Sequence, residues 1–561
     1  MHLSCPGWPL QRSPRSRTGR APAREGRAVQ ALDFALALLS GVLLALSFPK
    51  FGHPAVAWIA LAPLLVGTCW GQTPPFLRHR GPNSHLESHR RLRFWGQTPR
   101  AFLLGLVTGG VYFAGTLYWL VETMTTFGGL STPLAAIAAA LLIAYLALFP
   151  AVFALIQVRI VRAIGSAGVL LAPVIWVATE MGRTYIWDGF PWELLGYSQV
   201  TVLPIAQVAS LVGVYGMSAL VAMVSAACAY IALEKGAKRW RPAAAVGVVL
   251  IAAGVWGSAR VQTHALTTAG SPIRVAVLQG NVAQEQKWDP ALADRILQRY
   301  IDMTRAAIAS GARFVVWPES ATPFNYEEEP LRAEAIRRLA REANLTLLIG
   351  SDQIEHLPPA SPGSPPTARY FNAAFLVRPD GTTGAVYRKI HLVPFGEFVP
   401  LKRLLFFVGP IVQAVSDYSP GSDPSLLPVA GHMASTAVCY EVIFSSLIRS
   451  FVTAGSELLT TITNDAWYGR SSAAYQHWEQ ASMRAIEEGR YLARAANTGI
   501  SGFVDPYGRV LQRSNMFEGA VMVEDLRFLT ARTLYSRIGD VVGWSSVALT
   551  LAVVLATRRP R

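Results

Sequence analysis

The chain has 561 residues, of which 52% are hydrophobic and only 15% are charged, and its net charge is +15. Soluble domains average about 25% charged residues, so this composition, with a mean hydropathy of +0.32, favours a membrane protein with one sizeable soluble part. Four cysteines in 561 residues exclude a disulfide-stabilised scaffold.

Long segments without Lys, Arg, Asp or Glu predict the membrane-spanning helices. A helix needs about 20 mostly apolar residues to cross the hydrocarbon core of a bilayer. Segments 101–121, 131–158 and 201–233 reach that length, whereas 167–179 and 541–557 are short. We expect eight spans, one for each uncharged segment: 34–49, 54–70, 101–121, 131–158, 167–179, 201–233, 243–258 and 541–557.

Basic residues gather in the segments outside the predicted spans. With eight spans, the five basic segments all fall on one side of the membrane: 1–30, 71–100, 159–162, 234–241 and 558–561. Lys and Arg are enriched in cytoplasmic loops, so both termini are expected in the cytoplasm. The positive charge therefore indicates membrane orientation, and we expect no nucleic-acid partner.

The predicted spans divide the chain into four parts. We expect a disordered Arg-rich cytoplasmic N-terminus (1–30), a seven-span domain (31–260), an extracytoplasmic catalytic domain (261–530), and a final helix with a short cytoplasmic tail (531–561). The long polar stretch lies between the seventh and eighth spans, on the side opposite the basic segments. The first span can direct insertion, so no cleavable signal peptide is needed.

Short apolar runs alternate with helical patterns in the polar stretch. Amphipathic patterns predict helices over 291–309 and 331–343. Continuous Val, Ile and Leu runs are typical of strands buried on both faces, which predicts an α/β sandwich of mixed sheets. The predicted strands are 273–278, 313–317, 345–350, 373–377, 435–438, 458–463 and 499–504.

Three candidate residues are placed at strand ends, where active sites of α/β folds gather. Glu319 follows the predicted strand 313–317, Cys439 follows 435–438, and Lys389 lies in Y-R-K-I-H-L-V-P-F-G-E-F-V-P. Cys439 is a candidate nucleophile, which needs a base and a positive neighbour. Glu319 could accept the thiol proton, and Lys389 could stabilise an oxyanion. His391 is a rival base, because Cys–His pairs are the commoner arrangement. Spacing alone does not choose between Glu319 and His391.

The soluble domain resembles the nitrilase (carbon–nitrogen hydrolase) superfamily over residues 272–525. The matching motifs are W-P-E ending at Glu319, Y-R-K-I-H-L-V-P-F-G-E-F-V-P around Lys389, C-Y-E from Cys439, T-N-D-A-W at 463–467, and R-A-A-N-T-G with D-P-Y-G at 494–508. With the predicted spans, the whole chain resembles the apolipoprotein N-acyltransferase family. Q-G-N-V-A-Q-E-Q-K-W at 279–288 and G-F-P-W-E-L-L-G-Y-S-Q at 189–199 support that narrower resemblance.

The resemblance implies a role for each matching residue. Glu319 would be the general base, Lys389 the oxyanion stabiliser and Cys439 the nucleophile, with no metal or cofactor. Glu397, Tyr440 and Glu441 would support this triad. Trp288 and Asn372 would line the substrate site, and Gly189 and Trp192 would belong to a loop near the membrane over which lipid could enter. His477 and Asp465 lie in matching stretches, and we interpret them as structural.

The resemblance also implies the substrates: a phospholipid acyl donor and a diacylated apolipoprotein acceptor, at the bacterial inner membrane with the catalytic domain on the periplasmic side. One alternative is a membrane-anchored amidase or nitrilase, which would not need seven spans before its domain. A second is a transporter that carries an inactive nitrilase fold. Few charges lie within the predicted spans, and Glu180 only borders the fifth, which disfavours ion-coupled transport.

Overall fold

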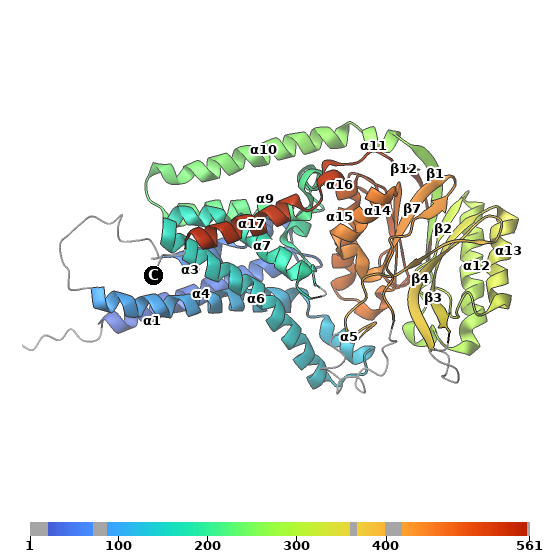
Figure 1. Cartoon of the computed structure of the whole chain (residues 1–561), viewed down its shortest axis with the longest axis horizontal. Helices are drawn as coiled ribbons and strands as arrows, with labels where there is room; N and C mark the ends of the chain where they lie inside the picture. Colours follow the sequence, from blue (N-terminus) through green and yellow to red (C-terminus); the bar gives the residue numbers. More distant parts are fainter. Residues whose placement is uncertain (1–20, 71–86, 188, 359–366, 399–417, 558–561) are drawn as a thin grey trace, which may run out of the picture.

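The computed structural model describes residues 21–70, 87–187, 189–358, 367–398 and 418–557. A bundle of helices and an α/β sandwich lie end to end along the longest axis of the molecule (Figure 1). Most of the expected N-terminal tail and part of the basic segment 71–100 lie outside the described residues. The first described helix begins at Ala21, within the segment expected to be disordered.

Helices form at all eight uncharged segments, although several are short or broken. The bundle contains α1 (Ala21–Ala45), α2 (Pro54–Ala57), α3 (Ala62–Cys69), α4 (Glu87–Thr116), α5 (Leu120–Thr126), α6 (Thr132–Ile164), α7 (Ala172–Tyr185), α8 (Leu203–Ala206), α9 (Ala209–Leu233), α10 (Arg241–Gln262) and α17 (Val541–Ala556).

Fewer helices than expected are long and apolar enough to cross a membrane. Among the described residues, three pass on length and composition: Thr132–Ile164, Ala209–Leu233 and Ala237–Thr268. A fourth would be the pair Thr98–Thr116 and Leu120–Thr126, which is bent by 52°. Shorter apolar helices include Val541–Ala556. The helical membrane region is therefore present, and the count of eight spans stays a prediction.

The sandwich consists of two six-stranded mixed sheets. In spatial order, the first contains β12 (Ala520–Phe528), β1 (Ser271–Gln279), β2 (Phe314–Val316), β3 (Thr346–Leu357), β4 (Thr367–Val377) and β5 (Thr383–Arg388). The second contains β11 (Val510–Arg513), β10 (Gly502–Val504), β9 (Leu492–Ala496), β8 (Leu458–Thr463), β7 (His432–Val438) and β6 (Leu427–Val429). The expected α/β sandwich is thus confirmed, with β5, β6, β9, β11 and β12 as strands that the sequence analysis did not identify.

Helices cover the outer face of each sheet. In Figure 1, α12 (Ala293–Ala309) and α13 (Pro330–Ala343) lie at the far end of the sandwich, whereas α14 (Ser445–Ala454) and α15 (Ala473–Glu488) lie between the second sheet and the bundle. This gives the layers α, β, β, α. The helix α15 also contacts α9 of the bundle, so one helix belongs to both the sandwich and the junction with the membrane region.

Buried polar contacts join the two parts. Glu487 on α15 accepts a hydrogen bond of 2.8 Å from the backbone N–H of Val214 on α9. Arg484, one turn earlier, donates to the hydroxyl of Tyr197 at 2.9 Å. Buried polar groups cost stability unless they are paired, and these pairs exist only when the bundle and sandwich are docked. The sandwich is therefore held in one orientation against the membrane region.

Candidate active site

The structure brings the three candidate catalytic residues together. Glu319 follows β2, Lys389 follows β5, and Cys439 follows β7, so two sheets contribute to one site. All three are buried, with exposed fractions of 6%, 1% and 5%. Convergence at strand ends is what the fold class predicts.

Two carboxylates surround the ammonium group of Lys389. Its Nζ lies 2.9 Å from the Glu397 carboxylate and 3.7 Å from Oε1 of Glu319. Burial alone would lower the pKa of Lys389, but Glu397 and Glu319 reverse this effect and raise it above its usual value. Lys389 therefore stays charged at neutral pH and can stabilise negative charge without exchanging its proton.

Asn372 links the same two carboxylates. Its Nδ2 donates to Oε1 of Glu319 at 2.7 Å and to Oε1 of Glu397 at 2.8 Å. These bonds fix the orientation of the amide, and its Oδ1 has no hydrogen-bond partner among the residues that the structure describes. Asn372 is therefore part of the network around Lys389, with one acceptor atom left for a bound molecule.

The backbone at Cys439 is in the left-handed region, with φ of 53°. Such strain in a residue other than glycine persists only where the surroundings enforce it. Burial and the nearby Glu319 together raise the pKa of Cys439 to about 12, against the opposing effect of Lys389. The resting side chain is consequently a thiol, and it would have to lose its proton to act as a nucleophile.

Glu441 fixes the turn that carries Cys439. Its Oε2 accepts from the backbone N–H of Val438 at 2.7 Å, and its Oε1 accepts from the N–H of Ile390 at 2.6 Å and the hydroxyl of Tyr387 at 2.8 Å. The segment after β7 is therefore tied to the segment that carries Lys389. Burial raises the pKa of Glu441 to about 7.

His391 is differently placed from Glu319. Its ring stacks on that of Phe444 with centroids 4.2 Å apart, and its backbone N–H donates to Glu441 at 3.1 Å. Glu319, by contrast, accepts from the backbone N–H of Asn464 at 2.8 Å and lies beside Lys389. The geometry favours Glu319 as the base.

His477 and Asp465 form a buried chain that ends at the backbone of Cys439. One ring nitrogen of His477 lies 3.1 Å from the carbonyl oxygen of Cys439, and the other lies 3.1 Å from Asp465. Arg494 completes the cluster at 3.0 Å from Asp465. Because the chain reaches a carbonyl and not the thiol, a structural role fits best.

Lys287 is a buried charge that the sequence analysis missed, although it lies in the quoted motif 279–288. Its side chain is buried, and its Nζ donates to the carbonyl oxygen of Glu319 at 3.1 Å. Burial lowers the pKa of Lys287 to about 8, against the opposing effects of Glu319, Asp352 and Cys439. Trp288, the predicted residue, is 45% exposed.

An aromatic wall connects this site with the bundle. We use "aromatic wall" for Trp119, Phe190, Trp192, Tyr440 and Tyr468. Ring centroids of Trp192 lie 5.4 Å from Trp119, 6.1 Å from Phe190 and 6.1 Å from Tyr468. Phe190 in turn lies 6.2 Å from Tyr440, which follows the nucleophile.

The loop that carries Trp192 is tightly held. Gly189 has a φ of 71°, and a Cβ there would lie 1.9 Å from the carbonyl oxygen of Thr184, so glycine is required. The carbonyl of Gly189 accepts from the Tyr440 hydroxyl at 3.2 Å. Both predicted loop residues therefore touch the surroundings of the nucleophile, directly or through the aromatic wall.

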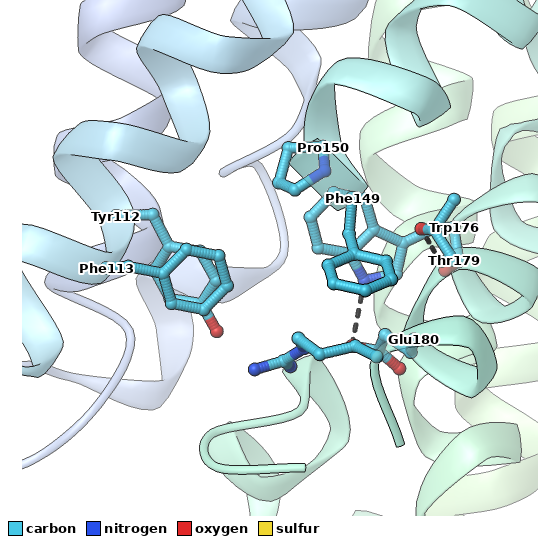
Figure 2. A pocket seen from close by; sticks show the side chains of 8 residues that line it. Tyr112, Phe113, Phe149, Pro150, Trp176, Thr179 and Glu180 are labelled. Carbon is cyan, nitrogen blue, oxygen red and sulfur yellow. Dashed lines mark hydrogen bonds between the residues drawn. The ribbon is translucent and has the colours of Figure 1, made fainter. Parts of the chain in front are cut away.

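A separate pocket lies inside the bundle, between α4, α6 and α7. Figure 2 shows Tyr112 and Phe113 on one side and Phe149, Trp176 and Glu180 on the other. None of the predicted site residues lines it. Arg183 at its edge donates to the carbonyl of Trp192 at 2.6 Å, so the pocket borders the loop of the aromatic wall.

Comparison with known proteins agrees with this division of the chain. Residues 40–228 match the family described as apolipoprotein N-acyltransferase N-terminal domain, and residues 274–534 match carbon-nitrogen hydrolase. An apolipoprotein N-acyltransferase of Geobacter metallireducens is 38% identical over 95% of this chain and 96% of its own length. One from Methylococcus capsulatus is 35% identical over 92% of this chain and 94% of its own. The chain therefore belongs to the apolipoprotein N-acyltransferase family.

Proposed function

We propose that this protein transfers a fatty acyl chain from a phospholipid to the α-amino group of the diacylglyceryl-cysteine at the N-terminus of an apolipoprotein. The observation that carries the proposal is the buried cluster of Cys439, Glu319 and Lys389 in a nitrilase-like domain docked on membrane helices. Family membership supports N-acylation of an apolipoprotein, because the relatives are named apolipoprotein N-acyltransferase.

The first half-reaction forms a thioester. The thiol of Cys439 gives its proton to Glu319 as the sulfur attacks the ester carbonyl of the phospholipid. The positive charge of Lys389 stabilises the oxyanion, an effect worth about 3–4 kcal/mol per donor in related chemistry. The carbon–oxygen bond breaks, and Glu319 returns the proton to the leaving lysophospholipid.

The second half-reaction forms the amide. The lipoprotein amine attacks the thioester, and Glu319 accepts its proton. The carbon–sulfur bond breaks, and Glu319 returns the proton to the sulfur, which regenerates the thiol of Cys439. An α-amine has a pKa near 7.7–8, so an appreciable fraction is neutral and nucleophilic around neutral pH. The relay lets two bulky lipids use one site in turn, which predicts ping-pong kinetics.

The aromatic wall supports transfer to the amine over hydrolysis. Trp192 is only 1% exposed and Tyr440 only 4%. An apolar lining of this kind excludes water from the thioester. An amidase with a membrane anchor would release its product to water and would have no use for this protection.

We further propose eight membrane spans, with both termini in the cytoplasm and the sandwich on the periplasmic side of the bacterial inner membrane. Apolar helices at all eight uncharged segments support the count, and the five basic segments support the orientation. Short helices can still cross when flanking residues extend them or the bilayer thins.

An assay with defined lipids tests the reaction. The purified full chain is incubated with phospholipid and a diacylated lipopeptide, and products are identified by mass spectrometry. We expect an amide on the lipopeptide. Free fatty acid or amide hydrolysis would instead support the membrane-anchored hydrolase, and no turnover would support the inactive-fold transporter.

The intermediate has its own test. Incubation with phospholipid alone should add one acyl mass to the peptide that contains Cys439, and hydroxylamine at neutral pH should remove it. Cys439→Ala should carry no adduct. Acylation of the lipopeptide that persists in this variant would contradict the thioester mechanism.

A further inference from the structure

Gln476 lies where the aromatic wall meets the catalytic sandwich. It is in the first turn of α15 and is 1% exposed. Its Oε1 accepts from the indole N–H of Trp192 at 2.8 Å and from that of Trp119 at 3.3 Å. Its Nε2 donates to the carbonyls of Thr116 at 3.1 Å and Pro49 at 3.3 Å. The side-chain amide of Gln476 therefore accepts two hydrogen bonds through its oxygen and donates two through its nitrogen.

The four partners come from three segments of the membrane region. Pro49 lies in the turn after α1, and Trp192 lies in the loop after α7. Thr116 is the last residue of α4, and Trp119 lies between α4 and α5. A buried amide with four partners has one orientation, since rotation would leave polar groups unpaired at a cost of about 1–3 kcal/mol each. Gln476 thus fixes these segments relative to α15.

The same turn of α15 reaches the nucleophile. His477, the next residue, contacts the carbonyl oxygen of Cys439 at 3.1 Å. Its ring also packs on Trp192, with centroids 5.7 Å apart. The position of the two indoles and the position of the nucleophile's backbone are therefore set by consecutive residues of one helix.

We propose that Gln476 is a positioning residue that holds Trp119 and Trp192 and, through them, the aromatic wall. The acyl chain of the lipid donor lies against the half-buried rings of this wall, Phe190 and Tyr468, while Cys439 attacks. The inference rests on the proposed function and extends it to the residue that aligns a lipid donor. A short ester has no long chain to align, so its reaction with Cys439 does not need this wall.

Gln207 provides a matched control. It is also a buried glutamine that joins the bundle to the sandwich, since its Nε2 donates to the carbonyl of Tyr507 at 2.8 Å. Its side chain forms hydrogen bonds with Leu203, Tyr507 and Arg260, which lie outside the aromatic wall. Gln207→Met removes a bond of the same kind between the two parts and leaves the wall intact.

The experiment compares two acyl donors in the full-length protein. Wild type, Gln476→Met and Gln207→Met are incubated with phosphatidylethanolamine in detergent micelles or with p-nitrophenyl acetate, and the rate of adduct formation on Cys439 is followed by intact mass. For Gln476→Met we expect a loss of roughly tenfold or more with the phospholipid, because small misplacements of a reactant are costly. With the short ester it should stay within about twofold of wild type, and Gln207→Met should do so with both donors.

Trp192→Phe is a second variant that tests the same inference if Gln476→Met does not fold. This variant keeps an aromatic ring but removes the indole N–H that Gln476 binds. We therefore again expect a slower reaction with the phospholipid and little change with the short ester. Equal losses with both donors, or an undiminished phospholipid rate in Gln476→Met, would overturn the inference. A wild-type protein that takes acetyl from the short ester but nothing from phospholipid would instead contradict the proposed donor.

Discussion

Lys389 is bound more closely by Glu397 than by Glu319. Its ammonium lies 2.9 Å from the first carboxylate and 3.7 Å from the second. Glu397 is therefore the closer anion to the cation, whereas the two oxygens of Glu319 accept hydrogen bonds from Asn372 and from the backbone N–H of Asn464. Because the two carboxylates contact Lys389 differently, we expect different effects when each is replaced.

Glu397→Gln should lower the rate of thioester formation by about 10²-fold with little effect on donor binding. The substitution removes the charge that holds Lys389 and places an amide next to the Nδ2 of Asn372. Single-turnover acylation by phospholipid measures this loss. Glu355→Gln is the control, because Glu355 pairs with Arg388 at 3.1 Å on a partly exposed side chain. Similar losses in both variants would count against a specific role for Glu397.

Glu319→Gln should abolish thioester formation in a protein that still folds, because the amide cannot accept the thiol proton. His391→Gln should keep substantial activity, since its ring stacks on Phe444 and the fixed contact of His391 with Glu441 is made by the backbone. Both rates can be followed by intact mass, with folding checked by the thermal midpoint in detergent. An active Glu319→Gln together with an inactive His391→Gln would show that the histidine is the base.

Asp465→Asn should destabilise the protein without removing any reacting group. Burial would raise the pKa of Asp465, but Arg494 and His477 hold it at about 2. Because the folded-state pKa is depressed, the stabilisation is complete above about pH 4 and is lost as the pH falls towards 2. At neutral pH the variant leaves Arg494 buried without its anion, which costs about 3–5 kcal/mol.

Denaturant unfolding in detergent at pH 7 measures this loss. Asp525→Asn is the matched control, because Asp525 pairs with Arg274 at 2.9 Å but its side chain is 66% exposed. Exposed pairs contribute about 0–1 kcal/mol. Equal unfolding free energies for the two variants would mean that the buried cluster contributes little.

Reporter fusions test the membrane orientation. A fusion after residue 235 should report the cytoplasm, and one after residue 530 should report the periplasm, because the basic segments favour the cytoplasmic side. A fusion after residue 270, just before β1, should agree with the one after 530. The same compartment for residues 235 and 530 would refute the proposed topology.

Two of the three candidate catalytic residues, Glu319 and Cys439, could be placed because they follow strands that are clear in the sequence. Buried runs such as Phe314–Val316 and residues 435–438 identify strand ends, and motifs identify Glu319 and Cys439 just after them. Lys389 was placed by its motif alone, because β5 before it was not identified. The strand Leu492–Ala496 was missed because Arg494 interrupts its apolar run. That arginine is fully buried and paired with Asp465, a contact between residues 29 positions apart that no local pattern reveals.

The helices of the membrane region were predicted less accurately than the strands, because contacts between residues distant in sequence shape them. The uncharged segment 201–233 has the composition of one span, yet it forms α8 and α9, and Gly213 within α9 has a φ of 66°. A Cβ at Gly213 would lie 2.4 Å from the ring of Tyr535, which is more than 300 residues later in the chain. Gln476 is a similar case, because its partners Trp192 and Pro49 are distant in sequence. Long-range packing of this kind leaves no periodic signal.

Lys287 should make thioester formation depend on pH. The groups whose charges act on it are Glu319 after β2, Asp352 on β3 and Cys439 after β7, and burial lowers its pKa to about 8. Lys389 stays protonated well above this pH, because the carboxylates around it raise its pKa. As the pH rises through about 8, Lys287 therefore loses its charge while the negative charge that develops at Cys439 still needs stabilisation.

The rate at which a short soluble ester acylates Cys439 should fall by on the order of tenfold as the pH rises from 7 to 9.5. The reason is that a nearby cation lowers the pKa of an acidic group by about one unit or more, so loss of the Lys287 charge makes the Cys439 thiol harder to deprotonate. Lys287→Arg should remove the fall, since a guanidinium stays charged throughout. Lys287→Met should be slow at pH 7 and show no step near pH 8, whereas the exposed Lys238→Met should keep the wild-type profile. A step near pH 8 that survives in Lys287→Met would assign the titration to another group.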